Sequence, residues 1–260
     1  MSNPASNVRA ILTCVGFDGM LALTLPNNMP RLKECLVVTS HTDLRTQALV
    51  AGIPGARCYC TDAFTRHGAK FNKGLALEEG FDVLGREGWL LLLDADIILP
   101  GDRPLPIAGL DPRGLYGARR HVLQAIHLWR PQQPWPPTRQ CPLKEIVGYF
   151  QLFHAQAPAA QSRPWYELDF AHAAASDVMF SRHWPSHQKR WLPNYPVLHF
   201  GATGENWFGR VSDRLDGTDT DRAAKAQLRR QLKRQQRQQR QLAHDRIPQL
   251  SGLAAPPPKT

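Results

Sequence analysis

The sequence predicts an α/β fold: an open, mostly parallel sheet with flanking helices, and a basic helix near the C-terminal end. First, the N-terminal half alternates short apolar or β-branched runs with polar, helix-compatible stretches. Second, Trp89–Leu93 is an uninterrupted apolar run, as in a strand covered on both faces. Third, positive charge gathers between residues 225 and 246. With 260 residues, 42% hydrophobic and 21% charged, the chain has a globular composition.

The N-terminal half contains the predicted parallel sheet. Strands are expected at Val8–Val15, Leu36–Thr39, Arg57–Cys60 and Trp89–Leu93. A helix is expected over Phe71–Gly85, because small and apolar residues recur there at helical spacing and glycine ends the run. This order of strands and helices predicts that ligands bind at the carboxyl ends of the strands.

The second half is rich in proline and aromatic residues. Five prolines between residues 130 and 142 exclude regular structure there and predict a long loop around Trp135. A further strand is expected at Val197–Phe200. Aromatic residues that either stack on a sugar or base or belong to the core are Phe150, Trp165, Tyr166, Trp184 and Trp191.

Most of the formal charge of +10 lies in one segment. The segment from Lys225 to Arg246 contains eight Lys or Arg and one acidic residue, Asp245, in a helix-favouring composition. The Pro-rich end that follows, Ala254–Thr260, is expected to be disordered. A basic tail on a nearly balanced body predicts an electrostatic contact with a polyanion.

The sequence also predicts where the protein resides. The longest apolar run, Trp89–Leu93, is far shorter than the ~18 residues of a membrane helix, so no integral membrane segment is expected. The first residues lack the basic start and apolar stretch of a signal peptide. The five cysteines show no zinc-type paired spacing and are expected to be reduced thiols, so we expect a cytoplasmic protein.

Asp94-Ala95-Asp96 is the strongest functional signal. Its two carboxylates directly follow the buried strand, where hard oxygens suit a divalent cation that also binds phosphate. The alternative is a turn with helix-capping or solvated aspartates. Since a buried strand that ends in two charges is costly unless the charges are neutralised, the cation site is the preferred interpretation.

With this motif after a β-α unit and before an aromatic second half, residues 8 to 210 resemble the GT-A class of nucleotide-sugar glycosyltransferases. The likeness is greatest to the family 2 type and to those of bacteriophages. It implies a GT-A-like domain over residues 1–215, with a nucleotide-sugar half (1–110) and an acceptor half (111–215), followed by the basic tail (216–260). It further implies an inverting hexosyl- or pentosyltransferase that uses Mn²⁺ or Mg²⁺ and a nucleotide sugar, most simply a UDP-sugar.

The resemblance also implies roles for individual residues. Asp94, Asp96 and the late His199 match the metal-binding positions, with Asp94 on the sugar or ribose side. The residues that match donor-binding segments are Thr39, Ser40, Asp43, Asn72, Lys73, Asp94, Gly201 and Gly204. Lys70, Lys73 or Arg119 would add positive charge on the donor phosphates, and Lys73 is favoured because it opens the predicted helix. For each of the three the alternative is a solvated surface charge. For His199 it is a hydrogen-bonded histidine beside a strand.

An inverting transfer needs a carboxylate that takes the acceptor proton. Asp177 matches the family's general base in chain order, and apolar neighbours would raise its pKa. Asp169 is the second candidate for this base. The alternative for Asp177 is an N-cap of the segment that starts at Val178.

The acceptor follows from the basic tail. The basic segment Lys225 to Arg246 could neutralise the phosphates of DNA and is therefore compatible with a DNA acceptor. The resemblance to bacteriophage enzymes implies that the acceptor groups are hydroxymethylated pyrimidine bases in DNA. For a phage-encoded enzyme, the expected location is the host cytoplasm. The competing acceptor is a surface or lipid-linked glycan, with the tail on anionic lipid.

Other classes fit less well. A haloacid-dehalogenase-type phosphatase also uses Asp-x-Asp after a strand, but it requires Thr or Val two positions after the second Asp, where this sequence has Ile98. Residues 15–19 do not supply the Gly-x-Gly-x-x-Gly of a dinucleotide-binding oxidoreductase. A non-catalytic basic nucleic-acid-binding module stays open, but it leaves Asp94 and Asp96 unexplained.

Overall fold

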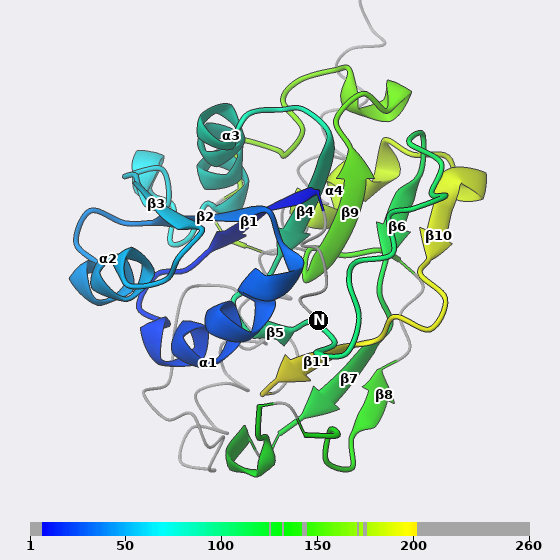
Figure 1. Ribbon diagram of the computed structural model, residues 1–260. Coiled ribbons are helices and arrows are strands. Elements are labelled where there is room, and N and C mark those ends of the chain that lie inside the picture. The colour runs from blue at the N-terminus through cyan, green and yellow to red at the C-terminus, as the bar shows by residue number, and fades with distance from the viewer. Residues whose placement is uncertain are drawn as a thin grey trace, which may run out of the picture. The chain divides into compact units, whose positions relative to one another are not determined.

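A seven-stranded sheet forms the centre of the fold, with the strand order β10-β6-β9-β4-β1-β2-β3 (Figure 1). The computed structural model describes residues 7–124, 126–131, 133–141, 145–170, 172–173 and 176–201. The strands are β1 (Val8–Thr13), β2 (Glu34–Thr39), β3 (Ala56–Cys60), β4 (Trp89–Leu93), β6 (Leu115–Gly117), β9 (Phe150–His154) and β10 (Lys189–Trp191). All neighbouring strands pair in parallel except β9, which runs antiparallel to both β4 and β6. The sheet is therefore mostly parallel, as predicted.

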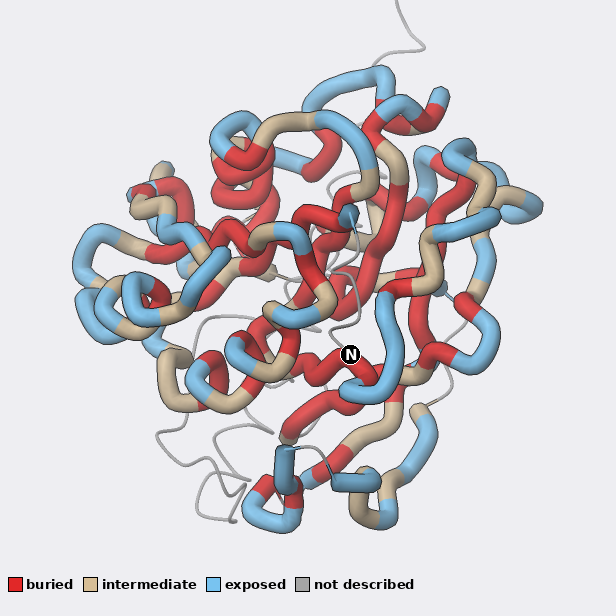
Figure 2. Tube along the Cα trace, in the orientation of Figure 1, coloured by how far each residue is buried: buried red, intermediate tan, exposed pale blue. Residues whose placement is uncertain are grey.

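Helices cover both faces of this sheet. They are α1 (Asp18–Asn28), α2 (Leu44–Ala51), α3 (Lys73–Leu84) and α4 (Ser176–Arg182), with short 3₁₀ turns at Met29–Arg31, Arg66–Gly68, Ile126–Leu128, Pro158–Ala160 and Ser186–Gln188. Helices α1 and α2 pack with Leu91 in one core, and α3 and α4 pack with Leu92 in the other. Because successive residues of a strand point to opposite faces, the apolar run of β4 supplies both cores. The strand is buried along most of its length (Figure 2).

A second sheet of four strands, in the order β5-β11-β7-β8, lies beside the first. Its strands are β5 (Ile97–Ile98), β7 (Arg120–Leu123), β8 (Arg139–Cys141) and β11 (Val197–Phe200). Strand β5 begins directly after Asp96 and pairs antiparallel with β11, so that His199 lies opposite Ile97. The chain thus passes from the large sheet to the small one through Asp94-Ala95-Asp96.

The structure confirms the five predicted strands and the helix of residues 71–85 to within a few residues at each end. One prediction is wrong. Residues 139–141 form the strand β8 inside the segment from which regular structure was excluded. This triplet contains no proline, so its backbone pairs antiparallel with β7. The short strands β6, β7 and β10 carry too few residues to show a periodic pattern in the sequence.

The chain divides into two compact units, Met1–Gly217 and Thr218–Thr260. The predicted basic helix and Pro-rich end belong to the second unit, which lies outside the described residues. The domain boundary at residue 215 stays a prediction. No helix in the described part of the chain combines the length and apolar character needed to cross a membrane.

Candidate functional site

Lys73 and Asp94 meet at the carboxyl end of β4. Lys73 is the first residue of α3, and its ammonium forms an ion pair with Asp94 Oδ1. The Lys73 side chain is 10% exposed and that of Asp94 33%. Burial lowers the pKa of Lys73, but the attraction of Asp94, and then of Asp177 and Asp96, outweighs burial and leaves the pKa raised. Lys73 is therefore a buried ammonium among carboxylates rather than a solvated surface charge.

Asp96 and His199 form a second pair, at the start of the small sheet. His199 Nε2 lies 3.6 Å from Asp96 Oδ2, and both side chains are largely buried. The backbone carbonyl of Asp96 accepts a hydrogen bond from the Phe200 amide at 2.9 Å, which fixes β11 beside the motif. Burial raises the pKa of Asp96, and His199 opposes this rise.

Two polar atoms of this pair have no hydrogen-bond partner among the described residues, Asp96 Oδ1 and His199 Nδ1. A buried polar atom without a partner is costly, and such atoms in a native site indicate a ligand that completes them. A carboxylate oxygen and an imidazole nitrogen are both metal ligands, and Mg²⁺ commonly takes one or two carboxylates together with substrate phosphates. Asp96 and His199 Nε2, which face each other at 3.6 Å, therefore fit a divalent cation that also holds a phosphate group, whereas His199 Nδ1, on the other side of the ring, does not face that position.

Asp94 does not join this pair. Within the part of the chain that the structure describes, no group of three or more His, Cys, Asp or Glu side chains is arranged to hold a metal ion. The reason is the turn in which the Ile97 amide bonds the Asp94 carbonyl at 3.2 Å. Asp94 ends the large sheet and faces α3, whereas Asp96 opens the small sheet and faces β11. Of the three predicted ligands, the structure thus pairs two with each other and one with Lys73.

Asp177 lies near the Lys73–Asp94 pair. It belongs to the first turn of α4, and its Oδ2 accepts a hydrogen bond from the Gly148 amide at 2.5 Å. Burial raises the pKa of Asp177, while Lys73 and the Gly148 amide lower it, and the net direction is upward. Its other oxygen accepts from the amide of the next residue, Val178, whereas an N-cap side chain bonds an amide two or three residues on. Since α4 begins at Ser176, Asp177 lies inside the helix and beside the site, and does not cap a segment that starts at Val178.

Asp169, the second candidate base, is exposed on the segment before α4. Of the donor-binding candidates at the end of β2, Thr39 is fully buried and donates to Asp43 Oδ2 at 3.1 Å. Asp43 also accepts hydrogen bonds from the amides of Gly16 and Thr46, at 2.7 Å and 3.1 Å, and so caps α2. Ser40 bonds the Thr42 hydroxyl at 3.0 Å. These side chains form a local network at the ends of β1 and β2.

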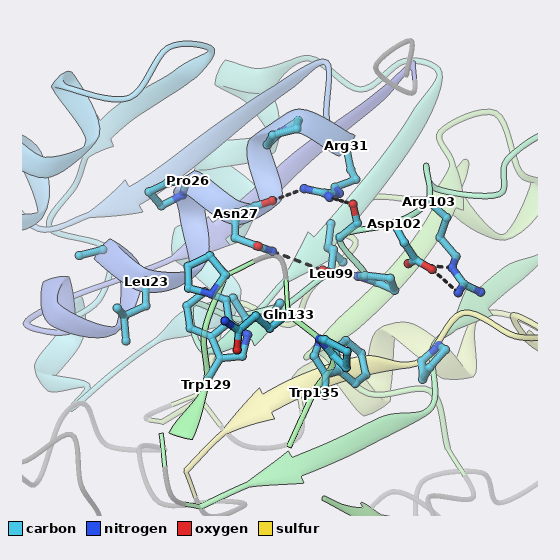
Figure 3. A pocket seen from close by; sticks show the side chains of 18 residues that line it. Leu23, Pro26, Asn27, Arg31, Leu99, Asp102, Arg103, Trp129, Gln133 and Trp135 are labelled. Atoms are coloured by element: carbon cyan, nitrogen blue, oxygen red, sulfur yellow. Dashed lines mark hydrogen bonds and ion pairs between the residues drawn. The ribbon is translucent and has the colours of Figure 1, made fainter. Parts of the chain in front are cut away.

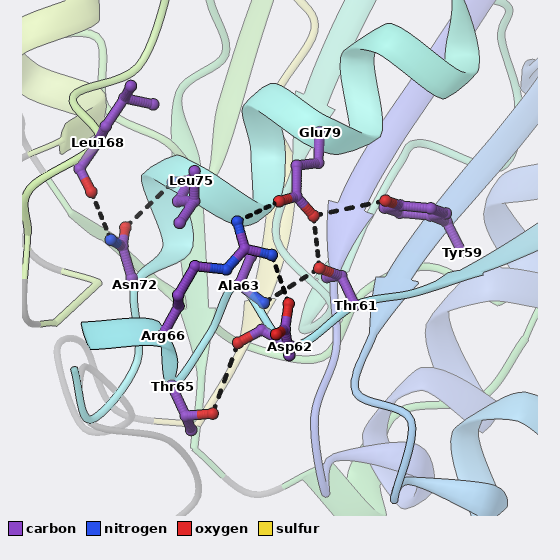
Figure 4. Close-up of polar contacts among 10 residues, drawn as sticks. All are labelled: Tyr59, Thr61, Asp62, Ala63, Thr65, Arg66, Asn72, Leu75, Glu79 and Leu168. Carbon is purple, nitrogen blue, oxygen red and sulfur yellow. Dashed lines mark hydrogen bonds and ion pairs between the residues drawn. The ribbon is translucent and has the colours of Figure 1, made fainter. Parts of the chain in front are cut away.

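Asn72 fixes the start of α3. Its side chain accepts from the Leu75 amide and donates to the Leu168 carbonyl, which ties α3 to the segment before α4 (Figure 4). The preceding loop is held by Glu79, which pairs with Arg66 at 2.7 Å and accepts a hydrogen bond from Thr61 (Figure 4). Since Lys73 follows Asn72 directly, these contacts set the position of its ammonium.

Two of the predicted donor-binding residues, Gly201 and Gly204, follow β11 in the sequence. Gly201 adopts φ +77°, a conformation that favours glycine, and the space where a Cβ would lie is open. Gly204 lies outside the described residues.

A pocket of about 1000 Å³ lies between α1, the segment after β5 and the segment around Trp129 and Trp135 (Figure 3). Six prolines help to line it, so its walls are stiff and apolar. It adjoins the core of the small sheet that contains Leu198 and Phe200, whereas the intervening His199 points to the other face. The pocket is therefore separate from the Asp96–His199 pair.

The conspicuous aromatic residues belong to the cores. Phe150, Trp165, Tyr166 and Trp184 are at most 2% exposed, and Trp191 packs against the same cluster as Trp165. Core packing, one of the two predicted roles, thus accounts for them.

Gln151 and Gly148 are site residues that were not predicted from the sequence. Gln151 is fully buried in β9 and donates to the carbonyls of Ile146 and Asp177, at 3.2 Å and 2.9 Å. Its oxygen accepts from the Tyr166 hydroxyl at 2.9 Å. A glutamine inside an otherwise apolar strand was the available signal. Gly148 gives no comparable signal, because its amide acts through the backbone.

Comparison with known proteins relates this fold to others. No family model matches the chain, and no curated protein matches it. Among solved structures, a crystal structure of GalNAc-T7 with UDP, GalNAc and Mn²⁺ is 10% identical, with a TM-score of 0.50 over 74% of this chain and 43% of that chain. Mannosyl-3-phosphoglycerate synthase from Rubrobacter xylanophilus is 21% identical over 45% of this chain and 41% of that chain, with a TM-score of 0.34. Glucosyl-3-phosphoglycerate synthase from Mycobacterium tuberculosis is 16% identical over 46% of this chain and 45% of that chain, also with a TM-score of 0.34.

The chain spans less than half the length of each of these structures. The similarity to the first of them, at this low identity, concerns the fold. Together with the mostly parallel sheet and the passage through Asp94-Ala95-Asp96 into a second sheet, it confirms the predicted architecture. The chain has a GT-A-like fold.

Proposed function

We propose that this protein is a metal-dependent nucleotide-sugar glycosyltransferase. The observation that carries the proposal is the buried Asp96–His199 pair at the carboxyl end of the central strand, in which His199 Nε2 lies 3.6 Å from Asp96 Oδ2 and Asp96 Oδ1 has no partner among the described residues. Ligands bind at this edge in open α/β sheets. The structural neighbour with the same fold holds UDP, GalNAc and Mn²⁺, which supports a UDP-sugar as the donor and Mn²⁺ or Mg²⁺ as the cofactor.

Asp96 and His199 would hold the cation, and the cation would neutralise the diphosphate that leaves the sugar. Lys73 forms an ion pair with Asp94 and holds it beside this position, where Asp94 can accept hydrogen bonds from sugar or ribose hydroxyls. Thr39, Ser40 and Asp43 border the same edge from β2 and are assigned to the nucleoside side.

Asp177 is the proposed general base. Its raised pKa favours uptake of a proton from the acceptor hydroxyl, and Lys73 stabilises the ionised form that must exist first. Direct attack by that hydroxyl on the anomeric carbon would invert its configuration. Asp169, which is exposed, is the less favoured base.

For the acceptor we propose hydroxymethylated pyrimidine bases in DNA. Support comes from the basic segment Lys225 to Arg246, which would bind phosphates without sequence preference. A surface or lipid-linked glycan is the competing acceptor.

Asp96→Asn tests the proposed activity. Since the amide carries no charge for the cation, Mn²⁺-dependent hydrolysis of a UDP-sugar and Mn²⁺-dependent UDP binding should both be lost. Calorimetry with UDP and Mn²⁺, and a chelator control on the wild type, give the readout. Asp102→Asn, at an exposed aspartate on the segment after β5, is the matched control. Activity of Asp96→Asn that persists in chelator would contradict the proposal.

A further inference from the structure

Arg120 is a buried arginine without a carboxylate partner among the described residues. It is 5% exposed, and no described Asp or Glu lies within ion-pair distance of it. Its Nε has no hydrogen-bond partner in the same part of the chain, and its Nη2 contacts the weak acceptor Cys141 Sγ at 3.6 Å. A guanidinium stays charged at every physiological pH, so burial without a counter-charge is costly. Such a cation calls for an anion that the described chain does not supply.

The sheet places Arg120 on the face of the proposed catalytic centre. In the register of β7 and β11, Arg120 lies opposite Val197 and Val122 lies opposite His199. Residues two apart in a strand share a face, so Arg120 and His199 point to the same side of the small sheet. Arg139 of β8 lies opposite Val122 and shares that side, and it is exposed. Two arginines therefore lie on the face of the small sheet that carries His199, both on its β7–β8 side.

Tyr149 connects Arg120 to the aspartate motif. The guanidinium carbon of Arg120 lies 4.7 Å from the centre of the Tyr149 ring, and the Tyr149 carbonyl accepts the Asp94 amide at 3.2 Å. The stack orients the guanidinium while leaving its N–H donors for another partner.

We propose that Arg120, assisted by Arg139, binds a phosphate group of the acceptor, a subsite that rests on the proposed transferase function. The donor candidates Thr39, Ser40 and Asp43 follow β2, on one side of β4. Arg120 follows β6, which lies on the other side of β4 and is separated from it by β9. An anion held by Arg120 therefore lies across the aspartate motif from the nucleoside, where an acceptor must enter. The planar, forked guanidinium suits bidentate binding of a phosphate.

The test is binding of inorganic phosphate to the full-length protein without nucleotide or metal, by calorimetry and by the rise in melting temperature with phosphate. Arg120→Gln should weaken phosphate binding by about tenfold or more, the decrease expected on removal of a charged hydrogen bond. UDP–Mn²⁺ binding by this variant should be unchanged. Arg190→Gln, at an exposed arginine of β10, should leave both affinities unaltered.

Arg120→Lys provides a second variant should the glutamine disturb folding. It keeps the charge but not the fork, so phosphate binding should fall less than in Arg120→Gln. Wild-type phosphate affinity in both variants would overturn the subsite. So would a decrease of UDP–Mn²⁺ binding in parallel with phosphate, since Arg120 would then serve the donor. Because the phosphate assay involves no sugar transfer, failure of the transferase proposal would appear separately, in the Asp96→Asn experiment.

Discussion

Lys73 stands among the carboxylates of Asp94, Asp96 and Asp177, and its charge acts on all of them. Its ion pair is buried on the lysine side and one-third exposed on the aspartate side. Removal of the lysine would leave Asp94 without this counter-charge, while solvent around Asp94 would moderate the penalty.

Lys73→Met should therefore lower the free energy of unfolding by about 2 kcal/mol, below the ~3–5 kcal/mol of a fully buried broken pair. Urea denaturation measures this. Lys70→Met, at an exposed lysine just outside the helix, should change stability little. Equal stability of the two variants would show that the ion pair contributes nothing.

Asp177→Asn separates catalysis from packing. The amide keeps the shape of the side chain and one of the two hydrogen bonds that the carboxylate accepts from backbone amides, but it does not take a proton, so sugar transfer should fall by roughly 10²–10⁴-fold. UDP–Mn²⁺ affinity, measured by calorimetry, should be retained. A parallel decrease of donor binding and transfer would assign Asp177 to the structure of α4 instead.

Helix α3 positions Lys73 through close packing against the segment before α4 and against the large sheet. A Cβ on Gly74 would meet the Glu167 carbonyl oxygen at 2.1 Å, and one on Gly80 would meet Val38 and Ile11 below 3.0 Å. Glycine at these positions lets the helix lie against the segment before α4 and against the sheet.

Gly74→Ala should destabilise the fold by about 1–3 kcal/mol, because the contact is with backbone that cannot rotate away. The shift should also weaken UDP–Mn²⁺ binding, since α3 positions Lys73 beside Asp94. Gly52→Ala is the matched control, because its Cβ would lie an ordinary 3.5 Å from the Leu49 carbonyl oxygen. A Gly74→Ala protein as stable as this control would contradict the close packing.

Across the full chain, the proposed roles divide between the folded sheets and the basic segment. The predicted DNA contact depends on charge in the segment Lys225 to Arg246, whereas donor binding depends on the carboxyl end of β4. The two properties should therefore be separable in the full-length protein.

Replacement of Arg229, Arg230, Lys233 and Arg234 by Gln should weaken binding to hydroxymethylcytosine DNA. It should also reduce the salt slope by roughly 0.9 for each phosphate that the protein no longer neutralises. UDP–Mn²⁺ affinity should not change. Gel shifts at several salt concentrations, together with a sugar-transfer assay on the same DNA, give the readout. DNA binding that changes neither with salt concentration nor with these substitutions would favour a glycan acceptor.

The parallel half of the fold could be predicted from residue patterns alone. The apolar run of β4 requires cover on both faces, and the strands and helix around it are long enough to show their periodicity. Asp94 and Asp96 could be identified in the same way, because two carboxylates follow the predicted buried strand, whereas His199 was identified through the family resemblance.

Which of these groups meet depends instead on how distant segments pair. The turn from β4 to β5 sends Asp94 toward Lys73 and Asp96 toward His199. This separation depends on a second sheet, of which only β11 was predicted from the sequence. Arg120 shows the same principle. In the sequence it is one of many basic residues, and its burial away from any described carboxylate arises from strand pairing between distant segments. Local pattern specifies elements, whereas contacts across the chain specify the site.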